Sequence, residues 1–121
     1  MIPRLVDSVR EGRPITLNAG GRPRMNPIYV GDVVRAVEAT LESSGDQLLN
    51  VAGDEAVTIR ELGQAMGRAL GRDPVFEQGS GAAPGDIVCA NVRMHAELAL
   101  AELVGIDDGI ALTAADAPVG V

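Results

Sequence analysis

The side chains that could do chemistry are few in this chain. The 121 residues include one tyrosine, Tyr29, one histidine, His95, and one cysteine, Cys89, and all ten basic residues are arginines. Without lysine, the chain alone cannot form a Schiff base, a phosphate-loop lysine contact or a tyrosine–lysine catalytic pair. His95 has no set of cysteines or carboxylates at metal-ligand spacing, so we expect neither a metal site nor a catalytic triad. We expect Cys89 to be a small buried apolar residue.

Arginine could bind an anionic ligand, because its planar guanidinium binds phosphate oxygens through two parallel hydrogen bonds. Arg22 and Arg24 stand two residues apart, directly after a Gly-Gly turn. They could bind an anionic ligand at this loop. The alternative is that both are solvated side chains on a turn.

Length and charge narrow the kinds of protein that this chain can be. The 121 residues suit one domain, and a hydrophobic share of 46% is typical of a globular protein. A net charge of −7 argues against nucleic acid and anionic membranes as partners. No apolar run approaches the roughly 18–20 residues of a membrane span. A single cysteine suits the cytosol, so we expect a cytoplasmic protein.

Regular structure must hold these residues in place, and the sequence indicates alternating helices and strands. Apolar residues at spacings of three and four predict helices, and short apolar runs between Gly or Pro predict strands. The expected helices cover residues 1–12, 33–42, 59–70, 92–103 and 109–113. The expected strands cover residues 15–17, 28–30, 47–52 and 74–77. This order indicates an α/β fold, or α+β for a fragment, with helices packed on short strands.

The helix expected at 33–42 follows an acidic residue, Asp32. A carboxylate at this position accepts hydrogen bonds from unpaired backbone amides and favours the positive end of the helix, so we expect Asp32 to be a structural N-cap. The apolar residues expected to face inward are Val33, Val34, Val37 and Leu41.

Thr58 and Glu61 are three residues apart, which is the spacing of a capping box, so we expect them to be structural caps of the next helix. The 47–52 segment before them is apolar on both sides. Such strands are typical of parallel sheets that helices cover on both faces. Because this strand lacks neighbours in the chain, we expect the isolated chain to be marginally stable or oligomeric.

Three stretches, taken in order, resemble one family. They are Met-Asn-Pro-Ile-Tyr-Val-Gly-Asp-Val-Val at 25–34, Leu-Asn-Val-Ala-Gly at 49–53 followed by Thr-Ile-Arg-Glu-Leu at 58–62, and Pro-Gly-Asp at 84–86. Together they resemble the C-terminal, substrate-binding part of the extended short-chain dehydrogenase/reductases. These are NAD(P)-dependent sugar epimerases, dehydratases and related reductases. The resemblance covers residues 1–113, and we expect residues 114–121 to be a disordered tail.

The resemblance implies a chain that holds parts of two lobes. In the family, the Gly-rich cofactor turn lies in an N-terminal Rossmann domain that has no counterpart here. The catalytic tyrosine and lysine also lie there, and Tyr29 is not that tyrosine because Val33 stands where the lysine would follow. The helix after Asp32 and the 48–52 strand resemble the last parts of the Rossmann sheet. The remaining helices and strands resemble the smaller substrate lobe.

The resemblance also suggests where a substrate would lie. The stretch that contains Asn26, Ile28 and Tyr29 lines the cleft between the lobes in the family, so these side chains could contact substrate. The alternative for Asn26 is turn chemistry, in which its side chain binds nearby backbone.

Many family members hold a nucleotide-sugar diphosphate with two arginines. Their positions correspond here to Met25 and Ala83, neither of which is an arginine, and Arg24 is one position away from the first. This departure weakens the case for a nucleotide-sugar substrate.

The function that these expectations describe is incomplete by itself. We expect no catalytic residue, bound cofactor or metal in this chain, and NAD or NADP in the complete enzyme. The expected partners are a small, sugar-like substrate and either the missing N-terminal Rossmann part or a second copy of the chain. The alternative is a non-catalytic, stand-alone binding or dimerisation module.

Overall fold

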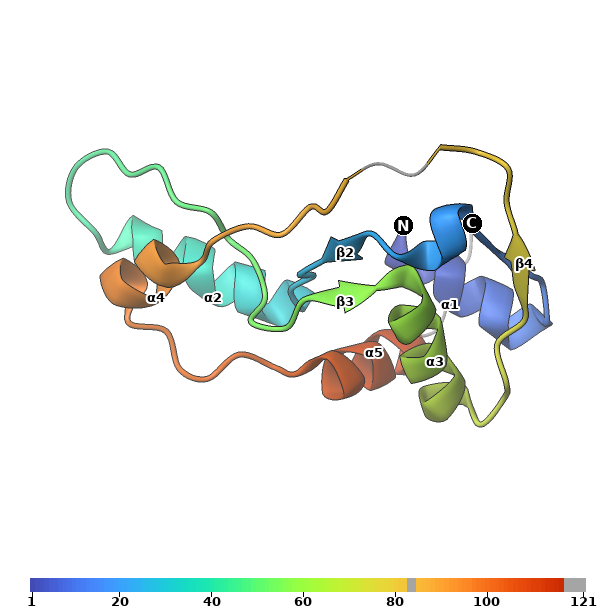
Figure 1. Cartoon of the computed structure of the whole chain (residues 1–121). Helices are drawn as coiled ribbons and strands as arrows, with labels where there is room; N and C mark the ends of the chain where they lie inside the picture. The colour runs from blue at the N-terminus through green and yellow to red at the C-terminus, as the bar shows by residue number, and fades with distance from the viewer. Residues whose placement is uncertain (83–84, 117–121) are drawn as a thin grey trace.

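The computed structural model describes residues 1–82 and 85–116, which form an elongated molecule with helices grouped toward its two ends (Figure 1). One end holds helices α2 (Val30–Leu41) and α4 (Val92–Leu98). The other group comprises helices α1 (Ile2–Glu11), α3 (Ile59–Leu70) and α5 (Ile106–Ala115). Long extended segments connect the two groups.

Within the described residues, four short strands form two separate pairs. Strand β1 (Ile15–Leu17) pairs in parallel with β4 (Phe76–Gln78). Strand β2 (Arg24–Met25) pairs antiparallel with β3 (Val57–Thr58). A short 3-10 helix, η1 (Asn18–Gly21), follows β1. Helices on short strands are the α/β arrangement that the sequence predicts.

The larger hydrophobic core, called core 1 below, joins α1, α3 and α5 to strand β1. The α3 residues Leu62 and Met66 are fully buried at its centre. The regular apolar spacing of α1 and α3 explains why these helices form and which faces they bury. The buried members of core 1 are Val6, Val9, Ile15, Leu17, Leu62, Ala65, Met66 and Ile110.

The smaller core, called core 2 below, lies between α2 and α4. Its buried members are Ala36, Met94 and Leu98, and partly buried residues such as Leu49 and Leu103 pack around them. We expected α4 to belong with the substrate lobe, but it packs on α2 instead. Met94 and Leu98 are four residues apart on α4 and present one apolar face to α2, which explains this packing.

Local capping explains several helix ends. The capping box at Thr58 and Glu61 is present: Thr58 Oγ1 accepts from the Glu61 amide at 3.1 Å, and Glu61 Oε2 accepts from the Thr58 amide at 2.8 Å. Helix α1 ends at Glu11, and its C-cap residue Gly12 has a φ of 73°, a left-handed conformation that glycine adopts without steric cost.

The predictions for residues 28–32 need correction. Residues 28–30 form no strand, because α2 already begins at Val30. Tyr29 is the N-cap residue of α2, and Asp32 lies inside the first turn, so Asp32 is not the N-cap. The predicted inward face is also wrong: Leu41 is 80% exposed, and the buried residues of α2 are Asp32 and Ala36.

Residues 47–52 form no strand either. A strand needs a hydrogen-bonded neighbour, and no described segment offers one at this place. Leu48 is 87% exposed.

The last helices also differ from the expected bounds. Helix α4 ends at Leu98, because Ala99 takes a left-handed conformation with a φ of 47°. Helix α5 runs from Ile106 to Ala115, so residues 114 and 115 are helical rather than part of a tail. Residues 117–121 of the expected tail lie outside the described residues. Among those described, no helix is long and apolar enough to cross a membrane.

Candidate functional site

Three extended segments meet in the middle of the molecule, and the side chain of Asn26 joins them. Its Nδ2 donates to the carbonyl oxygens of Gly53 (3.0 Å) and Cys89 (2.8 Å), and its Oδ1 accepts from the Cys89 amide (2.9 Å). The carboxamide therefore satisfies backbone groups that a neighbouring strand would otherwise pair with. These contacts are those of a structural side chain that binds nearby backbone.

Gly53 allows this close meeting because its surroundings leave no space for a side chain. A Cβ at Gly53 would overlap the carbonyl group of Pro27. The Gly53 amide donates to the carbonyl oxygen of Asn26 at 3.1 Å. Only glycine lets the two backbones approach this closely.

A second group of polar side chains fastens the same turn to helix α4. Asn91 Nδ2 donates to the Ala52 carbonyl oxygen at 3.1 Å and to Asp54 Oδ1 at 2.7 Å. His95 Nε2 lies 2.7 Å from the same Asp54 oxygen. The hydrogen bond from His95 is the largest cause of a lowered pKa at Asp54. Asn91 therefore ties α4 to the turn.

Arg24 is held by an acidic partner. Its amide donates to Asp86 Oδ1 at 2.8 Å, and its guanidinium lies 3.1 Å from Asp86 Oδ2. These hydrogen bonds, with the backbone contribution first, lower the pKa of Asp86. Met25 and Ile87 form a parallel bridge beside this pair. Of the two family arginine positions, Met25 lies in β2 and Ala83 lies outside the described residues.

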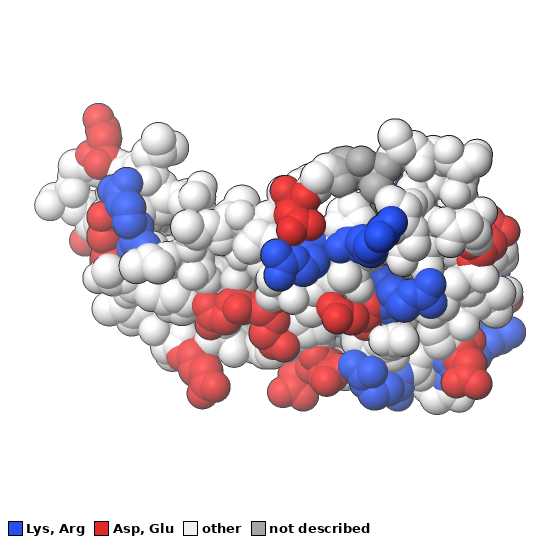
Figure 2. Space-filling model, viewed as in Figure 1, with Lys and Arg blue, Asp and Glu red and all other residues white. Residues whose placement is uncertain are grey.

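Arg22 is exposed and lies after η1, where its Nε donates to the Ala19 carbonyl oxygen at 3.0 Å. The surface in this view carries arginines and carboxylates interspersed rather than one basic patch (Figure 2). Arg24 is the first residue of β2, and Arg22 lies two residues before it. Arg24 already has a carboxylate partner, Asp86.

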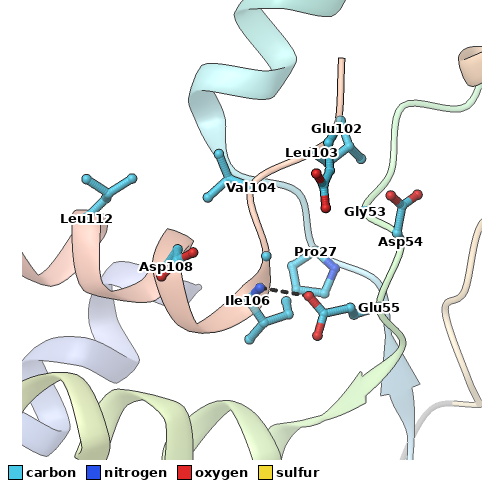
Figure 3. Close-up of a pocket in the computed structure, with 11 residues that line it drawn as sticks. Pro27, Gly53, Asp54, Glu55, Glu102, Leu103, Val104, Ile106, Asp108 and Leu112 are labelled. Carbon is cyan, nitrogen blue, oxygen red and sulfur yellow. Dashed lines mark hydrogen bonds between the residues drawn. The ribbon is translucent and has the colours of Figure 1, made fainter. Parts of the chain in front are cut away.

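Two adjoining pockets lie beside the Asn26 junction and share Pro27 and residues 104–106 as a common wall. The larger, with a volume of about 710 Å³, has acidic side chains around it (Figure 3). Its acidic lining residues are Asp54, Glu55, Glu102 and Asp108. Among the described residues, no group of three or more His, Cys, Asp or Glu side chains could hold a metal ion.

The smaller pocket has a volume of about 350 Å³ and a mostly apolar lining. Ile28 and Tyr29, two of the sequence-predicted site residues, line it together with Ile2, Ile106 and Ile110. It lies between the start of α1, the segment before α2 and one side of α5. The structure therefore brings Ile28 and Tyr29 to one cavity, while the side chain of Asn26 is bound to backbone.

The shared wall is fixed by two carboxylates. Asp32 is only 1% exposed; its Oδ2 accepts from the Val104 amide at 2.8 Å, and its Oδ1 pairs with Arg35. Glu55 Oε1 accepts from the Ile106 amide at 2.9 Å, at the start of α5 (Figure 3). Both carboxylates satisfy backbone amides that would otherwise lack partners.

Sequence reasoning missed these long-range roles because the partners are far apart in the chain. Asp32 and Val104 are separated by 72 residues, and no spacing rule links them. The prediction that Cys89 is buried was wrong: it is exposed, because its segment lies on the surface and only its backbone binds Asn26.

Comparisons with known proteins give a consistent answer about the fold. No protein-family model matches the chain. A curated relative, the dTDP-4-dehydro-6-deoxyglucose reductase of Escherichia coli, is 25% identical over an alignment of 118 positions, and the match covers 91% of this chain and 36% of the relative.

Solved structures of epimerases and dehydratases have a portion with a similar fold. The Thermus thermophilus UDP-glucose 4-epimerase, in complex with NAD, is 26% identical with a TM-score of 0.78, and the match covers 93% of this chain and 38% of the epimerase. The Bacillus anthracis dTDP-glucose 4,6-dehydratase, also with NAD, is 20% identical with a TM-score of 0.76, and the match covers 93% of this chain and 37% of the dehydratase. The chain thus spans little more than a third of each relative.

Proposed function

We propose that this chain, which has the fold of a fragment of the NAD-dependent epimerases and dehydratases, is the substrate-binding portion of such an enzyme and is inactive alone. The complete enzyme would supply an N-terminal Rossmann part with its NAD or NADP site. The chain would be cytoplasmic, as its single cysteine suggests. The observation that carries the proposal is the cavity beside Ile28 and Tyr29, in a chain that matches just over a third of its relatives.

The substrate class comes from the relatives, whose names refer to dTDP- and UDP-linked sugars. In this proposal the sugar lies in the smaller pocket against Ile28 and Tyr29. Arg22 lines neither pocket, and the carboxylates of the larger pocket would repel a diphosphate, so the diphosphate would extend out of the smaller pocket toward Arg22. Arg22 suits this role better than Arg24, whose guanidinium must first leave Asp86. Asn26 acts indirectly here, since its bonds to Gly53 and Cys89 hold the pocket wall in place.

The contribution of these residues to the reaction is binding and positioning rather than proton transfer. The chain contains no lysine, so it cannot supply the family's tyrosine–lysine pair. The bound NAD of the complete enzyme would supply hydride transfer. The chain's residues would orient the sugar and exclude water from it.

Calorimetry tests this proposal. UDP-glucose titrated into the isolated chain is expected to bind weakly, and the heat should fall in Arg22→Ala and Tyr29→Ala. NAD titrated alone should give no heat. The matched control is Arg13→Ala, which removes an exposed arginine that pairs with Glu11. Tight NAD binding by the isolated chain, or equal loss in the control, contradicts the proposal.

The alternative, a non-catalytic dimerisation module, draws support from the exposed apolar side chains of α2, such as Leu41 at 80% exposure. Sedimentation distinguishes the two functions. A tight dimer without sugar-nucleotide binding favours the module, whereas a weakly associating chain that binds UDP-glucose favours the enzyme portion.

A further inference from the structure

Helix α5 begins without a side-chain cap of its own. Its N-cap residue is Gly105, which has no side chain to accept from the first backbone amides of the helix. Glu55 supplies the acceptor from 51 residues earlier in the chain, since its Oε1 accepts from the Ile106 amide at 2.9 Å (Figure 3). The same oxygen lies 3.3 Å from where a Cβ at Gly105 would stand. Glu55 therefore occupies the place of the missing cap.

The turn that Glu55 caps forms part of the smaller pocket. Ile106 and Gly109 line this pocket, as does Tyr29. A Cβ at Gly109 would lie 3.5 Å from Tyr29 Cβ and 3.8 Å from Tyr29 Cγ. These are ordinary van der Waals distances, so the backbone of α5 packs closely on Tyr29. The position of this first turn thus determines how wide the pocket is at Tyr29.

The two ends of this turn are held more firmly than its middle. Ile110, which follows the turn, is 4% exposed and belongs to core 1. Before the turn, the Val104 amide donates to the buried carboxylate of Asp32. Between them, Glu55 holds the backbone by a hydrogen bond from an exposed side chain. A turn held in this way can open locally while the rest of the fold stays intact.

We infer that Glu55 is a positioning residue, which holds the first turn of α5 against Tyr29 and thereby sets the shape of the smaller pocket. The consequence for the sugar rests on the proposed function, which places the sugar in this pocket. Glu55 itself lines the larger pocket, so it acts through the backbone of Ile106 and not by contact with the sugar. Without Glu55 the turn opens, Tyr29 becomes more accessible and the sugar loses one wall of its pocket.

Three substitutions of Glu55 separate the position of its oxygen from its negative charge. Glu55→Gln keeps an acceptor oxygen at the same distance from the backbone but removes the charge. Glu55→Asp keeps the charge on a side chain that is one methylene shorter, so its oxygen falls short of the Ile106 amide. Glu55→Ala removes both. This separation matters because the larger pocket carries further carboxylates, whose repulsion of a diphosphate depends on charge alone.

Quenching of Tyr29 fluorescence by acrylamide tests the inference without a ligand. The chain has one tyrosine and no tryptophan, so the emission reports on Tyr29. We expect the quenching constant of the full chain to rise about twofold or more in Glu55→Ala and Glu55→Asp, because the opened turn exposes the ring. Glu55→Gln should leave it unchanged. Glu102→Ala is the matched control, because it removes another exposed carboxylate of the larger pocket, outside α5.

Calorimetry with UDP-glucose extends the test to binding. The affinity should fall about three- to tenfold in Glu55→Ala and Glu55→Asp, which is the effect of losing one helix cap when binding requires the closed turn. Glu55→Gln should restore the affinity of the unaltered chain. A merely electrostatic role would instead move Glu55→Gln together with Glu55→Ala, since both lack the charge.

Other outcomes overturn the inference. Equal quenching in the unaltered chain and Glu55→Ala shows that the turn stays closed without Glu55, and a change in Glu55→Gln as large as in Glu55→Ala shows that charge is what matters. If Glu55→Ala has no cooperative melting transition, Glu55→Asp against Glu55→Gln decides, and equal quenching in these two overturns the inference. Quenching needs no sugar, so a chain that does not bind UDP-glucose contradicts the proposed function while the role of Glu55 at Tyr29 is still decided.

Discussion

The two hydrophobic cores of this chain differ in how completely they are closed. In core 1, α1 and α3 bury their apolar stripes against β1 and α5, and Met66 has no exposed surface. In core 2, α2 buries one face and leaves Val34 and Val37 on another face about half exposed. The capping box of α3 and the left-handed end of α1 add local support to core 1 alone.

The apolar faces of the core 1 helices are covered within the chain, whereas one face of α2 beside core 2 is not covered by any described residue. Core 1 has regular helices with local caps and a central cluster from four elements. Core 2 has fewer buried apolar side chains, and polar contacts over long distances in the chain, such as Asp32 with Val104, fasten the segments around it. We therefore expect core 1 to determine the stability of the chain and core 2 to open first.

The largest effect is expected at the centre of core 1. Met66→Ala leaves a cavity in a fully packed site and should lower the free energy of unfolding by about 2–5 kcal/mol. Urea denaturation measures this change. Leu48→Ala, at a side chain that is 87% exposed, is the control and should change the value by less than about 0.5 kcal/mol. Similar losses in both variants would contradict the contrast between the cores.

The next largest effect is expected in core 2. Asp32→Ala leaves the Val104 amide and the Arg35 guanidinium without their buried partner, and should cost about 2–3 kcal/mol. Hydrogen exchange should show the loss at Val104 and in α2, with core 1 amides protected as before. Asp46→Ala, at an exposed residue, is the control. Faster exchange in α1 and α3 as well would show that the two cores open together.

A smaller effect concerns the start of α3. Thr58→Ala removes the hydroxyl that accepts from the Glu61 amide and should cost about 1 kcal/mol. Thr58→Ser keeps that acceptor and should recover most of the loss in urea denaturation. If Ser and Ala destabilise equally, the capping box adds little to core 1.

The smallest effect is a dependence on pH at the junction. The pKa of Asp54 lies below its ordinary value of 3.8, so the group's contribution to stability is present above that value and is lost as pH falls through the folded-state pKa. Asp54→Asn should remove this acid-sensitive contribution, which is at most about 1 kcal/mol because the pair with His95 is half exposed. Thermal melts from pH 2 to pH 6 test this, with Glu97→Gln on α4 as control. If the melting temperature of Asp54→Asn depends on pH as that of the unaltered chain does, the contact with His95 does not contribute to stability.

The sequence predicts core 1 well because its signals are local. The stripes of α1 and α3, the capping box at Thr58 and Glu61, and strand β1 all follow from residues within a few positions of each other. The predicted strand at 74–77 differs from β4 by only one or two residues at each end.

The sequence predicts core 2 and the candidate site less well because their geometry depends on distant partners. Asp32 has the pattern of an N-cap, yet it binds an amide 72 positions away. Residues 47–52 have the composition of a buried strand, yet no described neighbour pairs with them. Sequence rules of this kind indicate which secondary structure a segment favours. They do not reveal whether the surface that the segment packs against belongs to the same chain.

The junction at Asn26 has a consequence for the chemical ageing of the protein. Asparagines commonly deamidate when the next backbone nitrogen attacks the side-chain amide to form a succinimide. Residue 27 is proline, whose nitrogen carries no hydrogen and cannot make that attack. The amide that donates to Gly53 and Cys89 is therefore protected from this route to aspartate.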